Sequence, residues 1–220
     1  MKYKYLLFDL DGMLVDTLEG VVKSAQYALK HFGIEADITE LDPFLGPPLT
    51  YSFMTYYNFT PERAAEAVAK YRERYDVKGV EECRLFDEVP GLLDDLKNAG
   101  YILGVATSKY EAYAGKMLNK LGIGCKFEYI TGSNLEETIS TKDEVIEEAL
   151  RRFGISDKRS EALMIGDMKY DDIGAKKAGI DCFGVYTGTA SPGEHESNGA
   201  TYIAYSFEDL RKTLLDWAKD

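Results

Sequence analysis

The sequence beyond residue 90 alternates between short apolar runs and amphipathic stretches, and this alternation constrains the fold more than any other feature. Apolar runs typical of buried strands occur at 101–106, 127–131, 162–165 and 180–185. Helical patterns lie at 90–100, 110–121, 142–153, 171–178 and 207–218. Regular alternation of this kind predicts a parallel sheet joined by right-handed crossovers.

A further apolar run at 3–10 precedes this region, and its composition is that of a strand buried on both faces of a sheet. The intervening residues 17–82 are helical in pattern and contain no convincing buried strand. We therefore predict an α/β fold. It has a Rossmann-like parallel-sheet core formed by residues 1–16 and 83–220, and an inserted α-helical cap at 17–82. The segment 188–199, rich in Gly, Ser, Glu and Pro, is predicted to be a surface loop.

The acidity of the chain limits its partners. The 220 residues carry a formal net charge of −12 at pH 7, and 45% of them are hydrophobic. The hydrophobic content is sufficient for a packed core. Because the net charge repels polyanions, we expect neither a nucleic acid polymer nor an anionic membrane as partner. An anionic substrate would have to be captured by local cations.

Targeting signals are not evident in the sequence. The first apolar run is short and is interrupted by Asp9 and Asp11, which does not fit a signal peptide. No stretch is long enough to span a bilayer. Cys83, Cys125 and Cys182 are odd in number and widely spaced, as expected of reduced thiols. We therefore expect a cytoplasmic protein, and leave its oligomeric state open between a monomer and a weak dimer.

Two carboxylates follow the first apolar run, in the sequence Asp9-Leu10-Asp11. In open α/β folds the carboxyl end of a strand is where ligands bind. Two carboxylates at this position repel each other and lose hydration, which is unfavourable unless a cation or hydrogen-bond donors compensate. The pattern favours a divalent metal and, with it, phosphate chemistry.

Polar residues also follow two other predicted strands. Thr107 and Ser108 come after the strand that ends at Ala106, and Asp167 comes after the strand that ends at Ile165, with Asp171 and Asp172 shortly beyond. The carboxyl ends of parallel strands lie on one edge of the sheet. We therefore expect these residues to lie near Asp9.

Lys142 begins a predicted helix, where a cation opposes the helix dipole unless an anion lies nearby. Thr141 and Glu144 have the spacing of a capping box around it. Together with the strand ends, this suggests an anion site with a metal. Asp9 and Asp167 would bind Mg²⁺, while Lys142, Thr107 and backbone N–H groups would hold phosphate oxygens.

Each of these features alone has a simpler interpretation. An Asp-x-Asp sequence is often a solvated turn, a Thr-Ser pair usually caps a helix, and a single helical lysine usually faces solvent. Lys109 either supplements the anion site or simply starts the next helix. The joint occurrence of the features at strand ends, with a helical insertion after the first strand, favours the functional interpretation.

Four segments resemble the motifs of the haloacid dehalogenase-like hydrolase superfamily, of the type with a helical cap after the first strand. They are residues 8–17, residues 105–108, Lys142 and residues 165–171. The resemblance implies that Asp9 is the nucleophile, which forms an aspartyl-phosphate, and that Asp11 is the general acid and base. It also implies that the phosphoryl group is bound by Thr107, Ser108, Lys142 and the backbone of Leu10. Mg²⁺ would be bound by Asp9, the Asp11 carbonyl, Asp167 and Asp171. Asp172 remains the alternative to Asp171.

The same resemblance narrows the activity. In having an acid at the Asp11 position, this chain resembles the phosphatases and sugar phosphomutases of the superfamily. The dehalogenases lack that acid. Residues 45–49 and 131–135 resemble phosphoglycolate phosphatase-like and 5′-nucleotidase-like proteins. The β-phosphoglucomutase branch has a histidine early in its cap, where this chain has residues 19–22 without one.

We therefore expect a Mg²⁺-dependent phosphatase whose partner is a small phosphorylated metabolite, a phosphoglycolate or a nucleoside 5′-monophosphate. A β-phosphoglucomutase-like sugar phosphomutase is the alternative, followed by a non-catalytic binding protein on the same fold.

Overall fold

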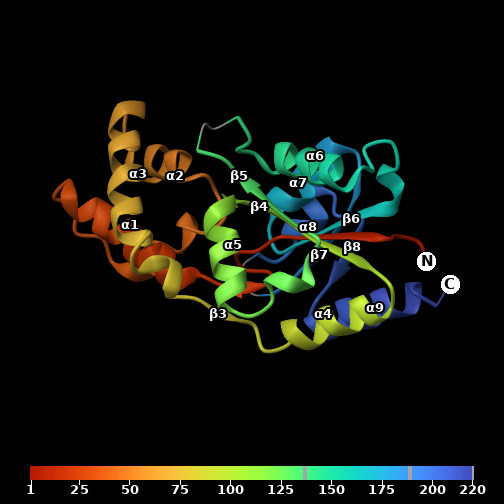
Figure 1. Cartoon of the computed structure of the whole chain (residues 1–220). Coiled ribbons are helices and arrows are strands. Elements are labelled where there is room, and N and C mark those ends of the chain that lie inside the picture. The colour runs from red at the N-terminus through yellow and green to blue at the C-terminus, as the bar shows by residue number, and fades with distance from the viewer. Residues whose placement is uncertain (136–137, 188–189, 220) are drawn as a thin grey trace. The chain divides into compact units, whose positions relative to one another are not determined.

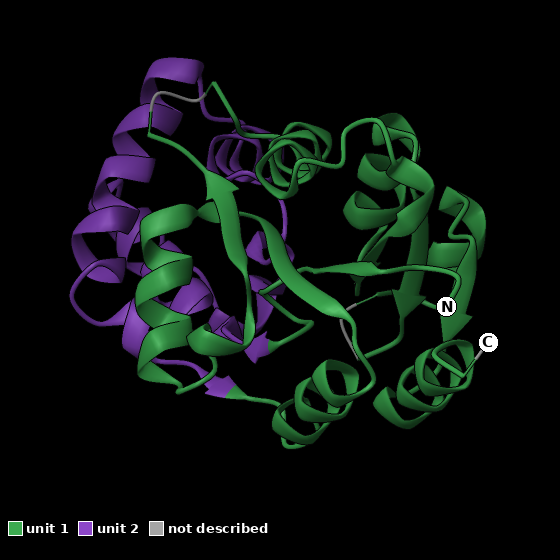
Figure 2. Ribbon diagram, turned by 45° about the vertical axis from the view of Figure 1, so that its right-hand side comes forward, with its two compact units in different colours: residues 1–14, 85–220 green, residues 15–84 purple. Residues whose placement is uncertain are grey.

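A computed structural model describes residues 1–135, 138–187 and 190–219 of the chain (Figure 1). The chain divides into two compact units. One comprises Met1–Leu14 and Leu85–Asp220, and the other comprises Val15–Arg84 (Figure 2). The first unit contains the large sheet, and the second is mainly helical.

Six strands of the described residues form one parallel sheet in the first unit, in the order β5-β4-β1-β6-β7-β8. Their bounds are β1 Tyr5–Phe8, β4 Ile102–Tyr110, β5 Tyr129–Ser133, β6 Ala162–Gly166, β7 Asp181–Val185 and β8 Tyr202–Ala204. The predicted α/β class, with a parallel-sheet core and an inserted helical segment, is confirmed.

The first strand, β1, lies at the centre of this sheet, between β4 and β6. Its residues Leu6, Leu7 and Phe8 are fully buried, as expected of a strand covered on both faces. Phe8 pairs with Val105 of β4 on one side and with Ile165 of β6 on the other. The residues that follow Phe8, Val105 and Ile165 in the chain therefore lie side by side at one edge of the sheet.

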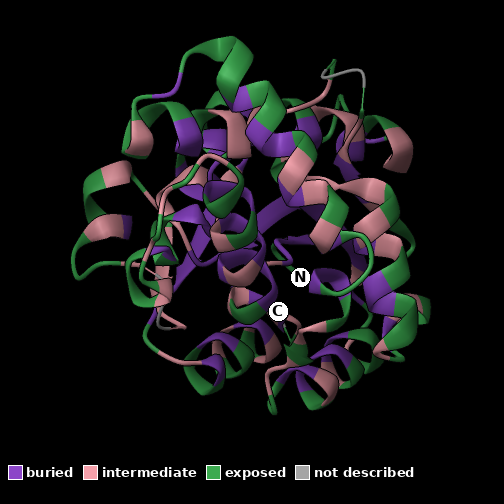
Figure 3. Cartoon of the chain, turned by 90° about the vertical axis from the view of Figure 1, so that its left-hand side faces the viewer, coloured by how far each residue is buried: buried purple, intermediate pink, exposed green. Residues whose placement is uncertain are grey.

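Helices cover both faces of the sheet. In Figure 1, α6 and α7 lie above it, and α4 and α9 lie below it. The helices of this unit are α4 Val89–Asn98, α5 Glu111–Lys120, α6 Lys142–Phe153, α7 Lys169–Ala178, α8 Glu194–Asn198 and α9 Phe207–Trp217. The apolar stripes of α6 and α7 pack on β1, β4 and β6 in one core cluster that includes Leu7, Ala106, Val145, Met164 and Ala175. Figure 3 shows buried positions alternating with exposed ones along the helices, as amphipathic sequences require.

The second unit has its own aromatic core. Its elements are β2 Val15–Asp16, α1 Leu18–His31, α2 Leu49–Tyr57 and α3 Pro61–Tyr75. At its last residue begins β3 Arg84–Leu85, which pairs with β2. The ring of Phe53 lies 5.0 Å from that of Phe44 and 5.9 Å from that of Phe59, centroid to centroid. Thr60 caps α3, because its hydroxyl accepts a hydrogen bond from the N–H of Arg63 at 3.3 Å.

Two local predictions from the sequence are wrong. The strand predicted to end at Ala106 continues to Tyr110, with a register irregularity against β5 between these two residues. The predicted surface loop at 188–199 contains the short helix α8, in which His195 is fully buried. Gly188 and Thr189, at the start of that segment, lie outside the described residues.

None of the helices in the described ranges has the length and apolarity needed to cross a bilayer. The three cysteines form no disulfide within the same ranges, and Cys182 is buried in β7.

Leu7 provides a test of the central strand. We expect Leu7→Ala to lower the free energy of unfolding by about 2–5 kcal/mol, because it leaves a cavity in the middle of the sheet. The matched control is Leu135→Ala, at a side chain 51% exposed, which should change the free energy of unfolding by less than about 0.5 kcal/mol. Urea denaturation of the two variants measures the difference, and equal losses would contradict the central position of β1.

Candidate active site

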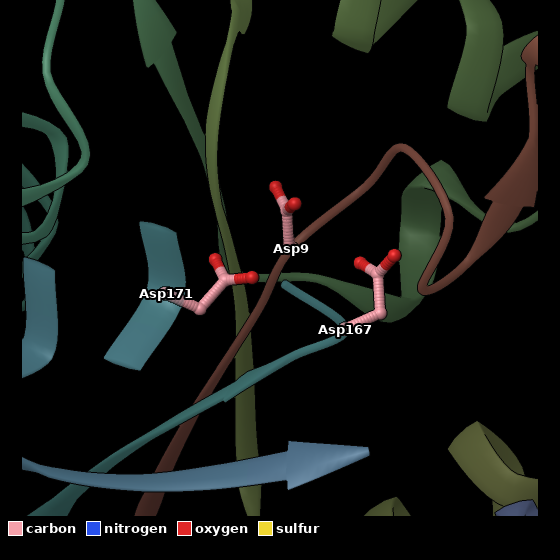
Figure 4. A group of neighbouring side chains, drawn as sticks. All are labelled: Asp9, Asp167 and Asp171. Carbon is pink, nitrogen blue, oxygen red and sulfur yellow. The ribbon is translucent and has the colours of Figure 1, made fainter. Parts of the chain in front are cut away.

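Three carboxylates converge at the carboxyl edge of the sheet (Figure 4). Asp9 follows β1, Asp167 follows β6, and Asp171 lies in the first turn of α7. Each is buried, and each offers an oxygen that lies within 4.8 Å of the oxygens of the other two. The structure thus brings together three of the residues that the sequence predicted to meet.

Local backbone geometry fixes the three positions. The N–H of Asp9 donates to the carbonyl of Ile165 at 2.9 Å, which extends the pairing of β1 with β6 by one residue. Asp171 Oδ2 accepts the N–H of Met168 at 3.2 Å. Gly166 leaves room for this carboxylate, since a Cβ there would lie 2.1 Å from Asp171 Cγ. Any side chain at position 166 would therefore displace Asp171.

Lys142, the first residue of α6, reaches into the carboxylate group. Its Nζ lies 2.6 Å from Asp9 Oδ1 and 2.9 Å from Asp171 Oδ1, and it donates to the carbonyl of Ala106 at 3.1 Å. The side chain is only 5% exposed. Nearby, Glu144 Oε2 accepts the N–H of Thr141 at 3.0 Å, as the predicted capping box requires. The cation that seemed unfavourable at a helix start is therefore stabilised by two carboxylates.

The charges in this group do not balance. Lys142 pairs with two of the three carboxylates, and the three ionised acids with this lysine sum to a formal charge of −2. Burial raises the pKa of Asp9 to about 6, against the opposing effect of Lys142 and with a further increase from Asp171 and Asp11. Burial would lower the pKa of Lys142, but Asp171 and Asp9 outweigh it and raise that pKa above its ordinary value. The lysine stays charged, while Asp9 remains only partly compensated.

Asp11 has a different neighbour. Its Oδ2 lies 2.8 Å from Lys109 Nζ, and both side chains are largely buried. The N–H of Lys109 also donates to Thr107 Oγ1 at 3.2 Å, and Thr107 is fully buried. Lys109 belongs to β4 and does not start the next helix, which begins at Glu111. The structure therefore adds to the site a cation that the sequence left undecided.

The remaining predicted phosphate-binding residues lie on the same segments. Leu10 is buried between Asp9 and Asp11, and its carbonyl accepts the N–H of Leu14 at 3.0 Å. Ser108 is partly exposed in the irregular part of β4. Gly12 has a φ of +83°, a conformation that glycine adopts without strain, and Thr187 Oγ1 donates to its carbonyl at 2.8 Å.

Asp172 does not join the carboxylate group. Its Oδ2 lies 2.9 Å from His195 Nδ1, and its Oδ1 accepts a hydrogen bond from Cys182 Sγ at 3.4 Å. Of the two adjacent acids, Asp171 is the one beside Asp9. The sequence did not predict the contact with His195. The sequence did contain one indication of such a contact, which is that two aspartates are adjacent on a helix. Successive helical residues point about 100° apart, so the two acids cannot both face one site, and the second needs a partner elsewhere.

The donor set fits a small divalent cation. Three carboxylate oxygens from separate elements lie close together in a buried, negatively charged position. Hard oxygen ligands of this kind suit Mg²⁺, and the cation would reduce the repulsion between the three carboxylates.

Known proteins share this architecture. The family model described as haloacid dehalogenase-like hydrolase matches residues 6–185. A 5′-nucleotidase of Pseudomonas aeruginosa is 40% identical over 215 residues, which cover 97% of this chain and 96% of that protein. The tyrosine-protein kinase PtkA of Mycobacterium tuberculosis is 33% identical over 212 residues, or 95% of this chain and 72% of the kinase.

Among solved structures, the crystal structure of a predicted phosphatase from Clostridium acetobutylicum superposes with a TM-score of 0.94 at 41% identity. The alignment covers 98% of this chain and all of that one. The chain belongs to the haloacid dehalogenase-like hydrolase family. Within that family it is a phosphatase, an enzyme that hydrolyses phosphoric monoesters.

The raised pKa of Asp9 predicts a pH-dependent stability. The folded-state pKa of about 6 lies above the ordinary value of 3.8, so protonation of Asp9 favours the folded state. This contribution to stability is fully present below pH 4 and is lost as the pH rises through 6. Asp9→Asn resembles the protonated acid. In metal-free protein we expect it to raise the free energy of unfolding by on the order of 3 kcal/mol at pH 8 and by almost nothing at pH 4. Denaturant titrations with a chelator at the two pH values measure this, and a variant less stable than wild type at pH 8 would contradict it.

Proposed function

We propose that this phosphatase is a Mg²⁺-dependent enzyme that hydrolyses a small phosphomonoester through an aspartyl-phosphate on Asp9. The observation that carries the proposal is the close approach of three buried acids, Asp9, Asp167 and Asp171, with the Lys142 ammonium paired to two of them. A group of this kind is unfavourable for folding alone. It is useful where a cation and a phosphoryl group bind together.

Asp9, Asp167, Asp171 and the carbonyl of Asp11 would hold the Mg²⁺. When bound, the ion supplies positive charge that stabilises the phosphoryl oxygens in the transition state and screens them from the attacking carboxylate. The three acids need not all ligate directly, because Mg²⁺ usually retains several waters. Asp171 would then act through water.

The reaction has two transfers. A carboxylate oxygen of Asp9 attacks phosphorus, the bond from phosphorus to the ester oxygen breaks, and Asp11 gives its proton to that leaving oxygen. A water molecule then attacks the phosphorus of the aspartyl-phosphate and gives its proton to Asp11. The bond to Asp9 breaks, inorganic phosphate leaves, and both carboxyl groups return to their starting states.

Four groups would orient the phosphoryl oxygens: the Thr107 hydroxyl, the Ser108 hydroxyl, the Lys142 ammonium and the backbone N–H of Leu10. Charge-assisted hydrogen bonds from a buried lysine are strong because water does not compete. Lys142 is well suited to this role, since, despite its burial, Asp171 and Asp9 raise its pKa above the ordinary value for lysine and keep the ammonium group charged at neutral pH.

Similarity to other proteins supports a substrate class. The 5′-nucleotidase of Pseudomonas aeruginosa aligns with nearly all of this chain, which supports a nucleoside 5′-monophosphate. The segments at 45–49 and 131–135 also resemble phosphoglycolate phosphatase-like proteins. We propose a small phosphomonoester of one of these two types.

Asp9→Asn tests the nucleophile. We expect hydrolysis of an aryl phosphate to fall by at least about 10³-fold, because an amide cannot form the covalent intermediate. The matched control is Asp143→Asn, at a partly exposed acid beside Lys142 whose Oδ1 lies 3.3 Å from Lys177 Nζ. That control should keep its activity within about twofold. Wild-type activity in the Asp9 variant, measured as phosphate release, would rule out the assignment.

Metal removal tests the cofactor. Dialysis against a chelator should reduce phosphate release to background, and addition of Mg²⁺ should restore it, because the site residues cannot neutralise a phosphoryl group alone. Addition of Ca²⁺ serves as the control, since its larger radius and higher coordination number suit the site less well. Full activity after chelation would contradict the proposed role of Mg²⁺.

A substrate panel tests the class. Nucleoside 5′-monophosphates, phosphoglycolate, sugar phosphates and pyrophosphate are each incubated with and without Mg²⁺. We expect Mg²⁺-dependent phosphate release from one of the first two. Isomer formation from a hexose 1-phosphate without phosphate release would identify a phosphomutase instead.

A further inference from the structure

The first turn of α7 carries two adjacent buried aspartates with different neighbours. Asp171 Oδ1 lies 2.9 Å from Lys142 Nζ within the carboxylate group, whereas Asp172 Oδ2 lies 2.9 Å from His195 Nδ1. Asp172 and His195 are both fully buried. A buried carboxylate is costly unless it is paired and hydrogen-bonded, so His195 stabilises this end of α7. The proposed mechanism makes no use of this pair.

The His195 ring is held by its surroundings. It lies against the backbone of β7 at Gly184, where a Cβ would approach the ring to 2.4 Å. The ring of Tyr186 packs against it edge to face, with the centroids 4.9 Å apart. With Asp172 on a further side, the imidazole has little freedom to move.

The preceding residue, Glu194, makes a second contact with the same turn. Its Oε1 accepts the N–H of Lys169, the first residue of α7, at 2.9 Å. The first N–H groups of a helix have no partner within the helix, so this contact satisfies one of them. We call Glu194 and His195 the α8 brace, since two consecutive residues of α8 hold the start of α7 at Lys169 and at Asp172.

The start of α7 in turn determines where Asp171 lies. The carboxylate accepts the N–H of Met168, and Gly166 leaves it just enough space. A small rotation of the first turn would therefore move Asp171 away from Asp9, and would also disturb Asp167, which lies in the short link from β6 to α7.

We propose that the α8 brace is a positioning device for the metal site, which acts through Lys169 and Asp172 to hold Asp171 and Asp167 in place for the cation. The inference rests on the proposed Mg²⁺ site. Loss of a group that orients metal ligands typically costs about 10- to 100-fold in metal affinity. Glu194 and His195 are thus positioning residues that need not touch substrate.

Calorimetric titration of metal-free protein with Mg²⁺ tests the brace without any turnover. His195→Ala should weaken Mg²⁺ binding by about 10- to 100-fold, the range typical of groups behind metal ligands. His195→Asn, whose amide N–H can replace Nδ1–H as the donor to Asp172, should stay within about threefold of wild type. His31→Ala is the matched control, because this second histidine is 40% exposed and pairs with Glu66 in the helical unit.

A second variant provides the test if His195→Ala does not fold. Glu194→Ala removes only a partly exposed side chain, and should weaken Mg²⁺ binding by about three- to tenfold. In both variants the Mg²⁺ concentration for half-maximal activity should rise by the same factor as the dissociation constant, while kcat at saturating Mg²⁺ stays within about threefold.

The outcomes separate the two proposals. Wild-type Mg²⁺ affinity in His195→Ala, or in Glu194→Ala if the former does not fold, overturns the brace even when stability is reduced. Failure of the wild-type protein itself to bind Mg²⁺ overturns the metal site and the brace together. Weaker binding in the alanine variants, with affinity recovered in His195→Asn, supports the brace.

Discussion

A single buried ammonium group, Lys142 Nζ, is shared by carboxylates from two different elements, and the polar centre of the core depends on it. Asp9 comes from the end of β1 and Asp171 from α7, and neither could be buried beside the other without a cation between them. Because Lys142 stands at the start of α6, its position links that helix to both. Because one ammonium group pairs with two carboxylates, a net negative charge remains, and a metal site requires such a charge.

At the strand ends, the residues that would best stabilise the fold differ from those that a metal site needs. Stability alone would favour apolar side chains at the strand ends, in continuation of Leu6, Leu7 and Phe8. The chain instead buries acids there, and the raised pKa of Asp9 reflects the resulting cost. The large apolar core formed with α6 and α7 offsets this local instability, so the acids remain in place before any ligand arrives.

Much of the site was predictable because it depends on strand ends. Once parallel strands were inferred from the apolar runs, Asp9 and Asp167 had to meet at one edge, and the unfavourable lysine at the start of α6 indicated an anion there. The helix at 142–153 was predicted with the bounds that the structure gives it. These predictions needed only periodicity and the topology of parallel sheets.

The parts that could not be predicted depend on individual tertiary contacts. Lys109 has a long side chain that can reach several acids, so its pairing with Asp11 follows from the continuation of β4, which no local pattern signals. Segment 188–199 has the composition of a loop, yet one residue in it, His195, is buried because Asp172 needs a partner. Composition describes the average of a segment and does not identify such a residue.

The central position of β1 has a consequence for the order in which the molecule forms. Tyr5 pairs with Ile102 on one side and with Ala162 on the other, so the middle of the sheet joins segments that are remote along the chain. Contacts of such long range form slowly, because the entropy of loop closure is lost before they are gained. During synthesis Asp9 is made long before Asp171, because the helical unit and several strands and helices of the first unit lie between them in the sequence. Asp9 therefore acquires its buried neighbours only after α6, β6 and the start of α7 have been made, so its charge is buried together with those of its partners.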